Sequence, residues 1–350
     1  MSPVPPANTE ATSPEERSVA ALRRKEALSR FALAGTLVFL CALFALTTHN
    51  HVFMKSTNLI NVASQSAINT IIAVGMTFVI VTGGIDLSVG SIVGLAAVFS
   101  TGVMVGGLGF TIGQYRVDLL PQLPGVGGVL IGLGAGLTVG ALAGLFNAMS
   151  IVRFRVTPFI ATLAMMLIAR GAGHLYSVEP IRGVPPAFIW IGQGRWLGIP
   201  IPVYLALTVV VIGWAVLSKT PFGRRVYAVG GNEEAARLSG IPVGRTKLLV
   251  YVASGLCAAT AGTVLAAQLQ AGDPKLGNAY ELDAIAAAVL GGTSLMGGRG
   301  TILGTVLGAL IIGVLDNGLT MLHVSSFAQM VIKGLVILGA VILDQARQRP

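Results

Sequence analysis

The sequence predicts an all-α protein that crosses a membrane about ten times, on three observations. Hydrophobic residues make up 54% of the 350 residues, charged residues only 11%, and the mean hydropathy is +0.80. A soluble domain carries about 25% charged residues. Glycine occurs 46 times, and small residues let membrane helices approach closely. We therefore expect a polytopic membrane protein of closely packed helices, several of them short or broken by glycine.

Ten apolar segments approach the length of a bilayer-crossing helix, which is about 20 residues. They are residues 31–48, 58–82, 88–108, 126–149, 157–176, 198–217, 247–269, 283–296, 301–319 and 326–343. No small-residue cleavage site follows the first segment, so we expect a retained span. Residues 1–27 are polar and contain prolines, which predicts a disordered basic tail before a single transmembrane domain over 28–350. The helix boundaries depend most on the divisions within 58–108 and 283–319.

The basic residues predict which side of the membrane each loop occupies. A net charge of +9 would suggest nucleic acid for a soluble protein, but in a membrane protein the Lys and Arg distribution reports orientation, and we expect no nucleic-acid partner. With the N-terminus inside, sixteen of the 23 basic residues are cytoplasmic: Arg17, Arg23, Arg24, Lys25, Arg30, Arg153, Arg155, Lys219, Arg224, Arg225, Arg237, Arg245, Lys247, Arg299, Arg347 and Arg349. Five are external, and Arg170 and Lys333 lie within spans. Both termini and the loop 218–247 are therefore expected in the cytoplasm.

The loop 218–247 is the longest polar segment between spans, and its centre predicts a short helix. Asn232 can accept hydrogen bonds from first-turn amides, Glu233 and Glu234 suit the positive end of the helix dipole, and Gly240 can end the helix in a left-handed conformation. Its small apolar face consists of Ala235, Ala236 and Leu238. From the residues alone, two interpretations stay open: a helix that meets a partner protein, or an ordinary solvated loop.

A glycine pair and a carboxylate mark a break between the second and third spans. Gly83 and Gly84 interrupt the apolar chain, and Asp86 and Ser88 follow at once. A carboxylate within apolar chain is costly and often functional, which makes Asp86 a candidate gate residue. The alternative is structural, because either Asp86 or Ser88 can cap the helix that follows.

Polar residues also occur inside the predicted spans. Asn61, Gln65 and Asn69 recur every four residues and so share one face of a helix, with Thr70 beside them. This stripe lines either a water-filled path or a contact between helices. Four further groups complete the set: Glu281 and Asp283 as first-turn acids, Asp316 in a predicted turn that ends the span, and Lys333 without an evident partner.

One of these motifs has a partial echo later in the chain. GGIDLSVG at 83–90 aligns with GGTSLMGG at 291–298, which pairs Gly83 with Gly291 and Gly84 with Gly292. Glycine-interrupted segments in corresponding positions point to a transport site. The two copies lie six predicted spans apart, however, whereas an inverted repeat requires an odd number.

The sequence shows no catalytic constellation. We find no nucleophile and base pair, and the glycine-rich stretch 291–300 lacks the G-x-x-x-x-G-K-[ST] pattern of a phosphate loop. His49 and His51 fall short of a metal site, and Cys41 and Cys257 suggest neither a disulfide nor a metal. We expect no enzyme and no bound cofactor, so active transport would draw its energy from an ion gradient or from another polypeptide.

Four motifs in collinear order resemble one family of transport proteins. They are GMTFVIVTGGIDLSVGSIVGLAA at 75–97, GRRVYAVGGNEEAARLSGI at 223–241, ELDAIAAAVLGGTSLMGGRGTILGTVLGALI at 281–311 and IKGLVILGAVILD at 332–344. Together they are similar to the permease subunit of ribose/xylose-type bacterial ABC sugar importers, a branch related to branched-chain amino-acid permeases. The resemblance extends from about residue 55 to 344 and leaves out the N-terminal tail.

The resemblance implies a type II ABC importer permease in the bacterial inner membrane that moves a monosaccharide inward by alternating access. It implies four kinds of partner: a cytoplasmic ATPase that binds the ATP and magnesium, a periplasmic or lipid-anchored solute-binding protein, a second copy or a sister permease, and membrane lipid. The coupling helix, which would dock on the ATPase, maps onto Asn232, Glu233, Glu234, Ala235, Ala236, Arg237 and Gly240.

Two other functions remain in view. The same scaffold could import another small polar solute, such as an amino acid, a nucleoside or a sugar derivative. An ion-coupled secondary transporter would need no partner and would leave the helix at 232–240 without a role.

Overall fold

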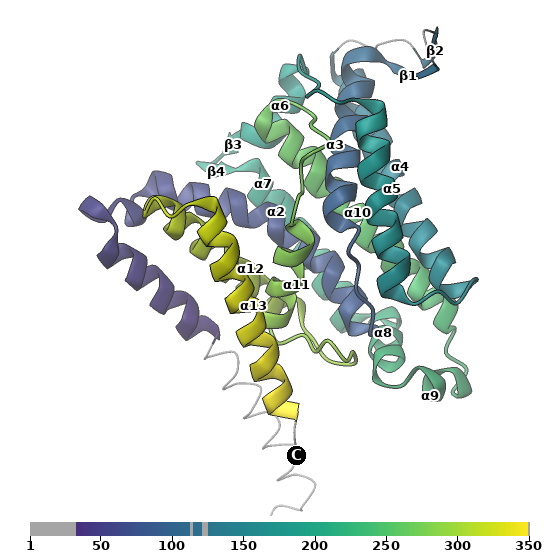
Figure 1. The fold of residues 1–350 in the computed structure, drawn as a ribbon, viewed down its shortest axis with the longest axis vertical. Coiled ribbons are helices and arrows are strands. Elements are labelled where there is room, and N and C mark those ends of the chain that lie inside the picture. The colour runs from purple at the N-terminus through teal and green to yellow at the C-terminus, as the bar shows by residue number, and fades with distance from the viewer. Residues whose placement is uncertain (1–32, 113–114, 121–124, 349–350) are drawn as a thin grey trace, which may run out of the picture.

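The computed structural model describes residues 33–112, 115–120 and 125–348, and it is almost entirely helical (Figure 1). The predicted tail, residues 1–27, lies outside the described residues. The helices are Leu33–Thr47, η1 (His49–Met54), α2 (Ser56–Val81), α3 (Val89–Gly106), α4 (Gly125–Val152), α5 (Pro158–Tyr176), α6 (Pro186–Gln193), α7 (Ile201–Lys219), α8 (Pro221–Gly231), α9 (Glu233–Leu238), α10 (Val243–Leu269), α11 (Tyr280–Leu290), α12 (Ile302–Met321) and α13 (Ser326–Gln348). Two short antiparallel hairpins, β1 (Leu108–Ile112) with β2 (Tyr115–Leu120) and β3 (Arg195–Trp196) with β4 (Ile199–Pro200), complete the fold.

The apolar helices correspond to the ten predicted segments. Seven of the described helices, namely α2, α3, α4, α5, α7, α10 and α12, are long and apolar enough to cross a membrane. Two shorter apolar helices, Leu33–Thr47 and Ser326–Gly339, match the first and last segments. The short segment near 283–296 is α11, which has only 11 residues. The all-α polytopic prediction is therefore confirmed.

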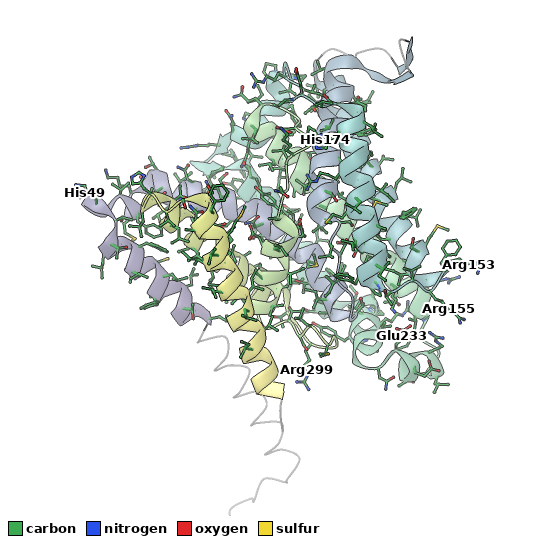
Figure 2. All side chains as sticks on the ribbon, in the orientation of Figure 1. His49, Arg153, Arg155, His174, Glu233 and Arg299 are labelled. Carbon is green, nitrogen blue, oxygen red and sulfur yellow. The ribbon has the colours of Figure 1, made fainter. Side chains whose placement is uncertain are left out.

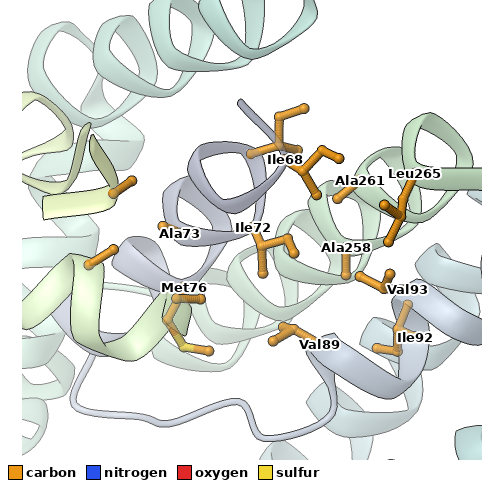
Figure 3. Close-up of a cluster of buried hydrophobic side chains, with 14 of the residues drawn as sticks. Ile68, Ile72, Ala73, Met76, Val89, Ile92, Val93, Ala258, Ala261 and Leu265 are labelled. Carbon is orange, nitrogen blue, oxygen red and sulfur yellow. The ribbon is translucent and has the colours of Figure 1, made fainter. Parts of the chain in front are cut away.

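Of the seven long apolar helices in the described part of the chain, α2, α3, α10 and α12 form the interior, and α4, α5 and α7 lie at the periphery. Within the most apolar 18 residues of each helix, the buried share is 89% in α2 and 83% in α3 but only 28% in α5 and in α7. Figure 3 shows the centre, where Ile72 and Met76 of α2 meet Val89 of α3 and Ala258 of α10. The less buried helices leave apolar faces free for lipid, as expected of a protein that spans a membrane.

Glycine lets α4 and α10 pack backbone against backbone. A Cβ atom at Gly255 would collide with the carbonyl oxygen of Gly140, and one at Gly144 would collide with that of Tyr251. Lipid tails are as apolar as leucine, so such close van der Waals packing is a main source of helix association in a membrane. The high glycine content thus has the structural role that the sequence predicts.

The bundle has two distinct ends. One end, here called the α9 end, carries α8, α9 and the connection between α11 and α12; the other carries α6 and the β1–β2 hairpin (Figure 1). Arg153, Arg155 and Arg299 lie at the α9 end together with Glu233, and His174 lies toward the other (Figure 2). These three basic residues, which we expect in the cytoplasm, therefore lie at the same end as α9.

We expect Gly255→Leu to lower the stability of the purified protein, because the side chain would force α4 and α10 apart. Overpacking of this kind costs about 1–3 kcal/mol. Thermal unfolding in detergent measures the effect, and Gly134→Leu is the matched control, since nothing lies within 4 Å of a Cβ at Gly134. Equal unfolding midpoints for the two variants would contradict this account of the packing.

Candidate functional site

The predicted helix at 232–240 is present as α9, and its ends have the expected structure. The Asn232 side chain accepts a hydrogen bond from the backbone amide of Ala235 at 2.9 Å. Glu233 and Glu234 occupy the first turn, and Gly240 takes a φ of 78° just beyond the helix. A left-handed conformation is one that glycine adopts without strain. The capping prediction is confirmed.

The predicted apolar face of α9 is wrong in one respect. Ala236 is buried against Val229 and Val243, whereas Leu238 is 81% exposed. The two residues are two positions apart, so they point to nearly opposite sides of the helix. One side of α9 thus packs on its own chain, and the other presents Leu238 to the exterior.

An ion pair ties α9 to the start of α10. Lys247 Nζ lies 2.6 Å from Glu233 Oε2, and Arg237 Nη2 lies 3.2 Å from Glu233 Oε1. The Lys247 side chain is only 16% exposed, so water screens its pair less than it screens the Arg237 pair. Because α10 runs through the whole bundle, this pair links α9 mechanically to the interior.

A second link joins α8 to two glycine-rich turns. Gly298 donates its backbone N–H to the Val81 carbonyl at 2.9 Å, and a Cβ at Gly230 would collide with that same carbonyl. Gly297 lies against the backbone of Gly83. We call this contact of Gly83, Gly230, Gly297 and Gly298 the glycine junction. It brings the end of α2, the end of α8 and the loop 291–301 together at the α9 end.

Tyr227 strengthens the junction from α8. Its hydroxyl donates to the Gly300 carbonyl at 2.7 Å. Burial raises the pKa of the Tyr227 hydroxyl, which therefore stays protonated and able to donate at neutral pH. The α8 helix is thus fixed to the loop by a side chain as well as by its backbone.

The two glycine motifs that echo one another meet in this junction. The left-handed residue that ends each helix is Gly83 after α2 and Gly292 after α11, with φ of 78° and 86°. In both turns the following amide bonds back to the last helical turn, Gly84 N to Val79 O and Thr293 N to Ala288 O. The backbones thus correspond with Gly83 matched to Gly292, one residue out of step with the sequence alignment. Both turns lie at the same end, as an even number of intervening spans requires.

Asp86 is fully buried, and its carboxylate joins the α2–α3 connection to α10. Oδ1 accepts from the backbone amide of Ser88 at 3.0 Å and from its hydroxyl at 2.5 Å, while Oδ2 accepts from the Ser254 hydroxyl of α10 at 2.9 Å. Asn147 of α4 donates to the Ser88 hydroxyl at 2.9 Å. Beside this network the buried Tyr251 hydroxyl has no hydrogen-bond partner among the described residues.

The capping interpretation is wrong for Ser88, whereas Asp86 accepts a hydrogen bond from the backbone amide two residues further on, as a helix-capping side chain does. Ser88 is the N-cap residue of α3, but its side chain accepts no hydrogen bond from the first turn, and Asp86 bonds to the amide of Ser88 itself. The carboxylate also holds the α2–α3 connection against α10, and the Ser88 hydroxyl holds it against α4. The sequence analysis did not single out these partners, Asn147 and Ser254, whose sequence signal is that each is a polar residue within an apolar helix.

The polar stripe on α2 faces outward from this chain. Asn61 and Gln65 are exposed and Asn69 is half-buried, whereas Thr70 is buried and bonds to the Ser66 carbonyl of its own helix. None of the three stripe amides contacts another described helix by a hydrogen bond. The stripe is therefore not a contact between helices within the described part of this chain.

A partly buried ion cluster, whose pairing the sequence analysis did not predict, joins α11, α12 and α13. Lys333 Nζ lies 3.1 Å from each carboxylate oxygen of Asp283 and 2.9 Å from Asp316 Oδ2. Asp316 stands within α12, which continues to Met321, so the predicted turn at this position is wrong. Asn317 accepts a hydrogen bond from Asn58 of α2 at 2.9 Å, which holds this turn of the helix in place. Spacing along the chain could not reveal partners that come from three helices.

Arg170 forms hydrogen bonds within the fold, and the histidines and cysteines considered as metal ligands form no metal site in the described part of the chain. Arg170 Nη1 donates to the carbonyls of Pro274 and Leu276 at 2.9 and 3.0 Å, which holds the chain before α11. Cys41 and Cys257 are free thiols. Within the described ranges, no three His, Cys, Asp or Glu side chains are placed to hold a metal ion.

A helical bundle with apolar faces open to lipid and, in its described part, seven helices long enough to cross a bilayer indicates a multi-pass membrane protein. Residues 58–341 match the family described as the branched-chain amino acid transport system permease component, and the chain belongs to that family.

Named relatives match over most of their length. The ribose import permease protein RbsC of Bacillus subtilis (strain 168) is 46% identical over 301 residues, which cover 85% of this chain and 88% of the relative. RbsC of Escherichia coli (strain K12) is 42% identical, with 89% and 94% covered. The L-arabinose transport system permease protein AraH of Escherichia coli (strain K12) is 38% identical, with 90% and 89% covered. No solved structure matches the chain.

We expect Lys333→Met to destabilise the protein more than Asp316→Asn. Removing the lysine leaves the buried Asp283 and the partly buried Asp316 without their cation, and breaking a buried pair costs about 3–5 kcal/mol. Asp316→Asn leaves Lys333 paired with Asp283. Thermal unfolding of the purified variants measures the order, with Lys275→Met, on an exposed loop, as the control. A Lys333→Met variant as stable as the control would refute the role of the cluster.

Asp86→Ala should lower the amount of folded permease in the membrane, because the Ser88 amide and the Ser254 hydroxyl would lose their acceptor. An unsatisfied buried polar group costs about 1–3 kcal/mol. Asp86→Asn keeps a carbonyl oxygen at the site and should accumulate near the normal level. Quantitative immunoblots of membranes test both variants. Loss of Asp86→Asn to the same extent as Asp86→Ala would show that the charge itself holds the fold.

Proposed function

We propose that this chain is the permease subunit of an ABC importer and that it moves a monosaccharide of the ribose class inward across the membrane. The relatives described above are named for ribose and arabinose import. The observation that carries the proposal is α9, a capped helix with an exposed outer side that is braced by Glu233 and Lys247. A helix held in this way can transmit a push from a partner into the bundle.

The α9 end is proposed to face the cytoplasm, with both termini on the same side. The basic residues at this end support that orientation. The partner at α9 would be the ATPase, which holds the ATP and magnesium, so this chain itself would need no cofactor. A solute-binding protein would dock at the other end, and a second copy or a sister permease would complete the path.

Two connections would carry movement of α9 into the bundle. One runs from Glu233 to Lys247 and along α10 to Ser254, which holds Asp86. The other runs from α8 through the glycine junction to the end of α2. Both reach the connection between α2 and α3, so ATP-driven movement of α9 would shift the broken helices between outward-open and inward-open arrangements.

The path itself is proposed to follow the exposed side of α2. Asn61, Gln65 and Asn69 offer amide groups that suit the hydroxyls of a sugar, and they find no partner within the described part of the chain. Asp86 and Ser88 would act near the inner end of that path as part of a gate. They would do so by positioning the α2–α3 connection, since both are fully buried.

An ion-coupled carrier is the second candidate, and one observation favours it. The cluster of Lys333, Asp283 and Asp316 places ionisable groups within apolar helices, where proton or ion relays are found. Such a carrier would transport its solute without a partner, and it would give α9 no task. The import of a different polar solute by the same scaffold is a third possibility, which the ligand of the co-purified binding protein decides.

Purification of the tagged chain from its own membranes tests the proposal, with Glu234→Arg as the informative variant. Glu234 is exposed on the outer side of α9, so charge reversal should spare folding, yet like charges at a docked interface cost several kcal/mol. We expect an ATPase to co-purify with the wild-type chain, and the amount that co-purifies with the variant to be lower by a factor of about ten or more. The matched control is Glu179→Arg, an exposed position outside the α9 end.

Three outcomes are informative. An ATPase and an exported binding protein in the wild-type preparation support the importer, and the ligand of the binding protein identifies the solute. Equal ATPase retention by Glu234→Arg and wild type would remove α9 as the coupling element. A lone wild-type chain that transports in vesicles without ATP would overturn the importer and favour the ion-coupled carrier.

A further inference from the structure

A hollow of about 610 Å³ lies at the α9 end, between the α4–α5 connection and the start of α10. Its volume is within the range of small-molecule sites, roughly 300–1,000 Å³. Val152 and Pro158 form its apolar wall, and Arg155, Arg237, Lys247 and Glu233 contribute its charges. Glu233, Arg237 and Lys247 also belong to the proposed coupling element, whereas Arg155 has no part in the coupling or in the proposed path.

The charges of the hollow favour an anion. Three basic side chains face one carboxylate, which leaves an excess of two positive charges. Glu233 already pairs with Lys247 and Arg237, at 2.6 and 3.2 Å. The Arg155 guanidinium, in contrast, forms no ion pair or hydrogen bond with any side chain or carbonyl that the structure describes. It is the group with all of its donors available.

The backbone at Arg155 adopts a left-handed conformation that is unfavourable for a residue with a side chain. Arg155 has a φ of 56°, in the left-handed region that costs a non-glycine residue about 1–2 kcal/mol. Arg155 lies between the end of α4 and the start of α5, where the chain turns. Glycine would adopt the same conformation without that cost. Strained residues of this kind gather at ligand sites.

The surroundings of the hollow place it at the level of lipid headgroups. Val152 is the last residue of α4 and Pro158 the first of α5, two helices that we assign to the membrane. Their most apolar windows are only 33% and 28% buried, so they expose apolar faces to lipid. Phe154, 71% exposed, stands beside Arg155. Arg155 lies at the margin of the bundle near Arg153 (Figure 2).

We propose that this hollow binds the phosphate group of an anionic phospholipid, with Arg155 as the principal ligand. A guanidinium can donate two parallel hydrogen bonds to one phosphate, and Arg237 and Lys247 add positive charge at the inner wall. The acyl chains lie along the exposed apolar faces of α4 and α5, beside Phe154 and Phe159. Basic hollows between membrane helices at the headgroup level bind anionic lipids in this manner.

The exposed residues beside the hollow favour a lipid over a soluble anion or an acidic segment of a protein partner. A soluble phosphate would use the basic groups but would leave the exposed phenylalanines Phe154 and Phe159 unexplained. A partner that docks on the outer side of α9 would meet Leu238 and Glu234, whereas Arg155 belongs to the connection between two lipid-facing helices.

Native mass spectrometry of the full-length permease tests the proposal, with phosphatidylglycerol as the probe and phosphatidylcholine as the uncharged comparison. We expect the wild-type chain to retain one phosphatidylglycerol molecule and Arg155→Gln to retain it about tenfold more weakly, which equals about 1.4 kcal/mol. Arg245→Gln removes the same charge from an exposed position on α10 that does not line the hollow, and it should behave as wild type.

A second variant separates lipid binding from folding. Arg155→Gly relieves the strained φ, so it should unfold at the same temperature as wild type or higher and still lose the phosphatidylglycerol. Retention of lipid by both Arg155 variants would overturn the proposal. If inorganic phosphate, added to the wild type in phosphatidylcholine, raised its unfolding temperature as much as phosphatidylglycerol does, the hollow would be assigned to a soluble anion. If Arg155→Gln lost a bound ATPase in phosphatidylcholine, with no anionic lipid present, the hollow would be assigned to the ATPase. Either of these two results would reject the lipid.

Discussion

The architecture depends on backbone contacts that only glycine permits. At the glycine junction, the end of α2, the end of α8 and the loop 291–301 approach so closely that a Cβ at Gly230 or Gly297 would meet main-chain atoms. The same constraint holds α4 against α10 through Gly140 and Gly255. Because the hydrophobic effect does not drive helices together within lipid, these contacts do much of the work that an apolar core does in a soluble protein.

Polar groups then make the packed helices specific. Asp86 joins the α2–α3 connection to α10, and Lys333 joins α13 to the two helices before it. Each of these groups is costly to bury alone and is accommodated because its partners are present. The result is a bundle in which a movement at α9 has two physical routes, one through α10 and one through α8, to the same break between α2 and α3.

Helix existence and the ends of α9 could be predicted from the sequence, because both depend on neighbours along the chain. Hydropathy defines a span, and Asn232 and Gly240 define the ends of α9 through local hydrogen bonds. The partners of Asp86 and Lys333 could not be predicted, since they come from distant helices whose relative rotation the sequence does not state. The predicted turn at Asp316 is wrong for the same reason. The sequence Asp316-Asn317-Gly318 is typical of a turn, and only the partners of these polar residues on other helices show that the helix continues.

The ion cluster has a consequence for how the protein is assembled in the cell. A lysine near the middle of a helix costs about 2.5–3.5 kcal/mol on insertion into a bilayer. Both carboxylates that neutralise Lys333 precede it in the chain, on α11 and α12. They have therefore already been synthesised when α13 leaves the ribosome, and the last helix can enter the membrane against its counter-charges. The order of the chain thus favours completion of the bundle over release of its final helix.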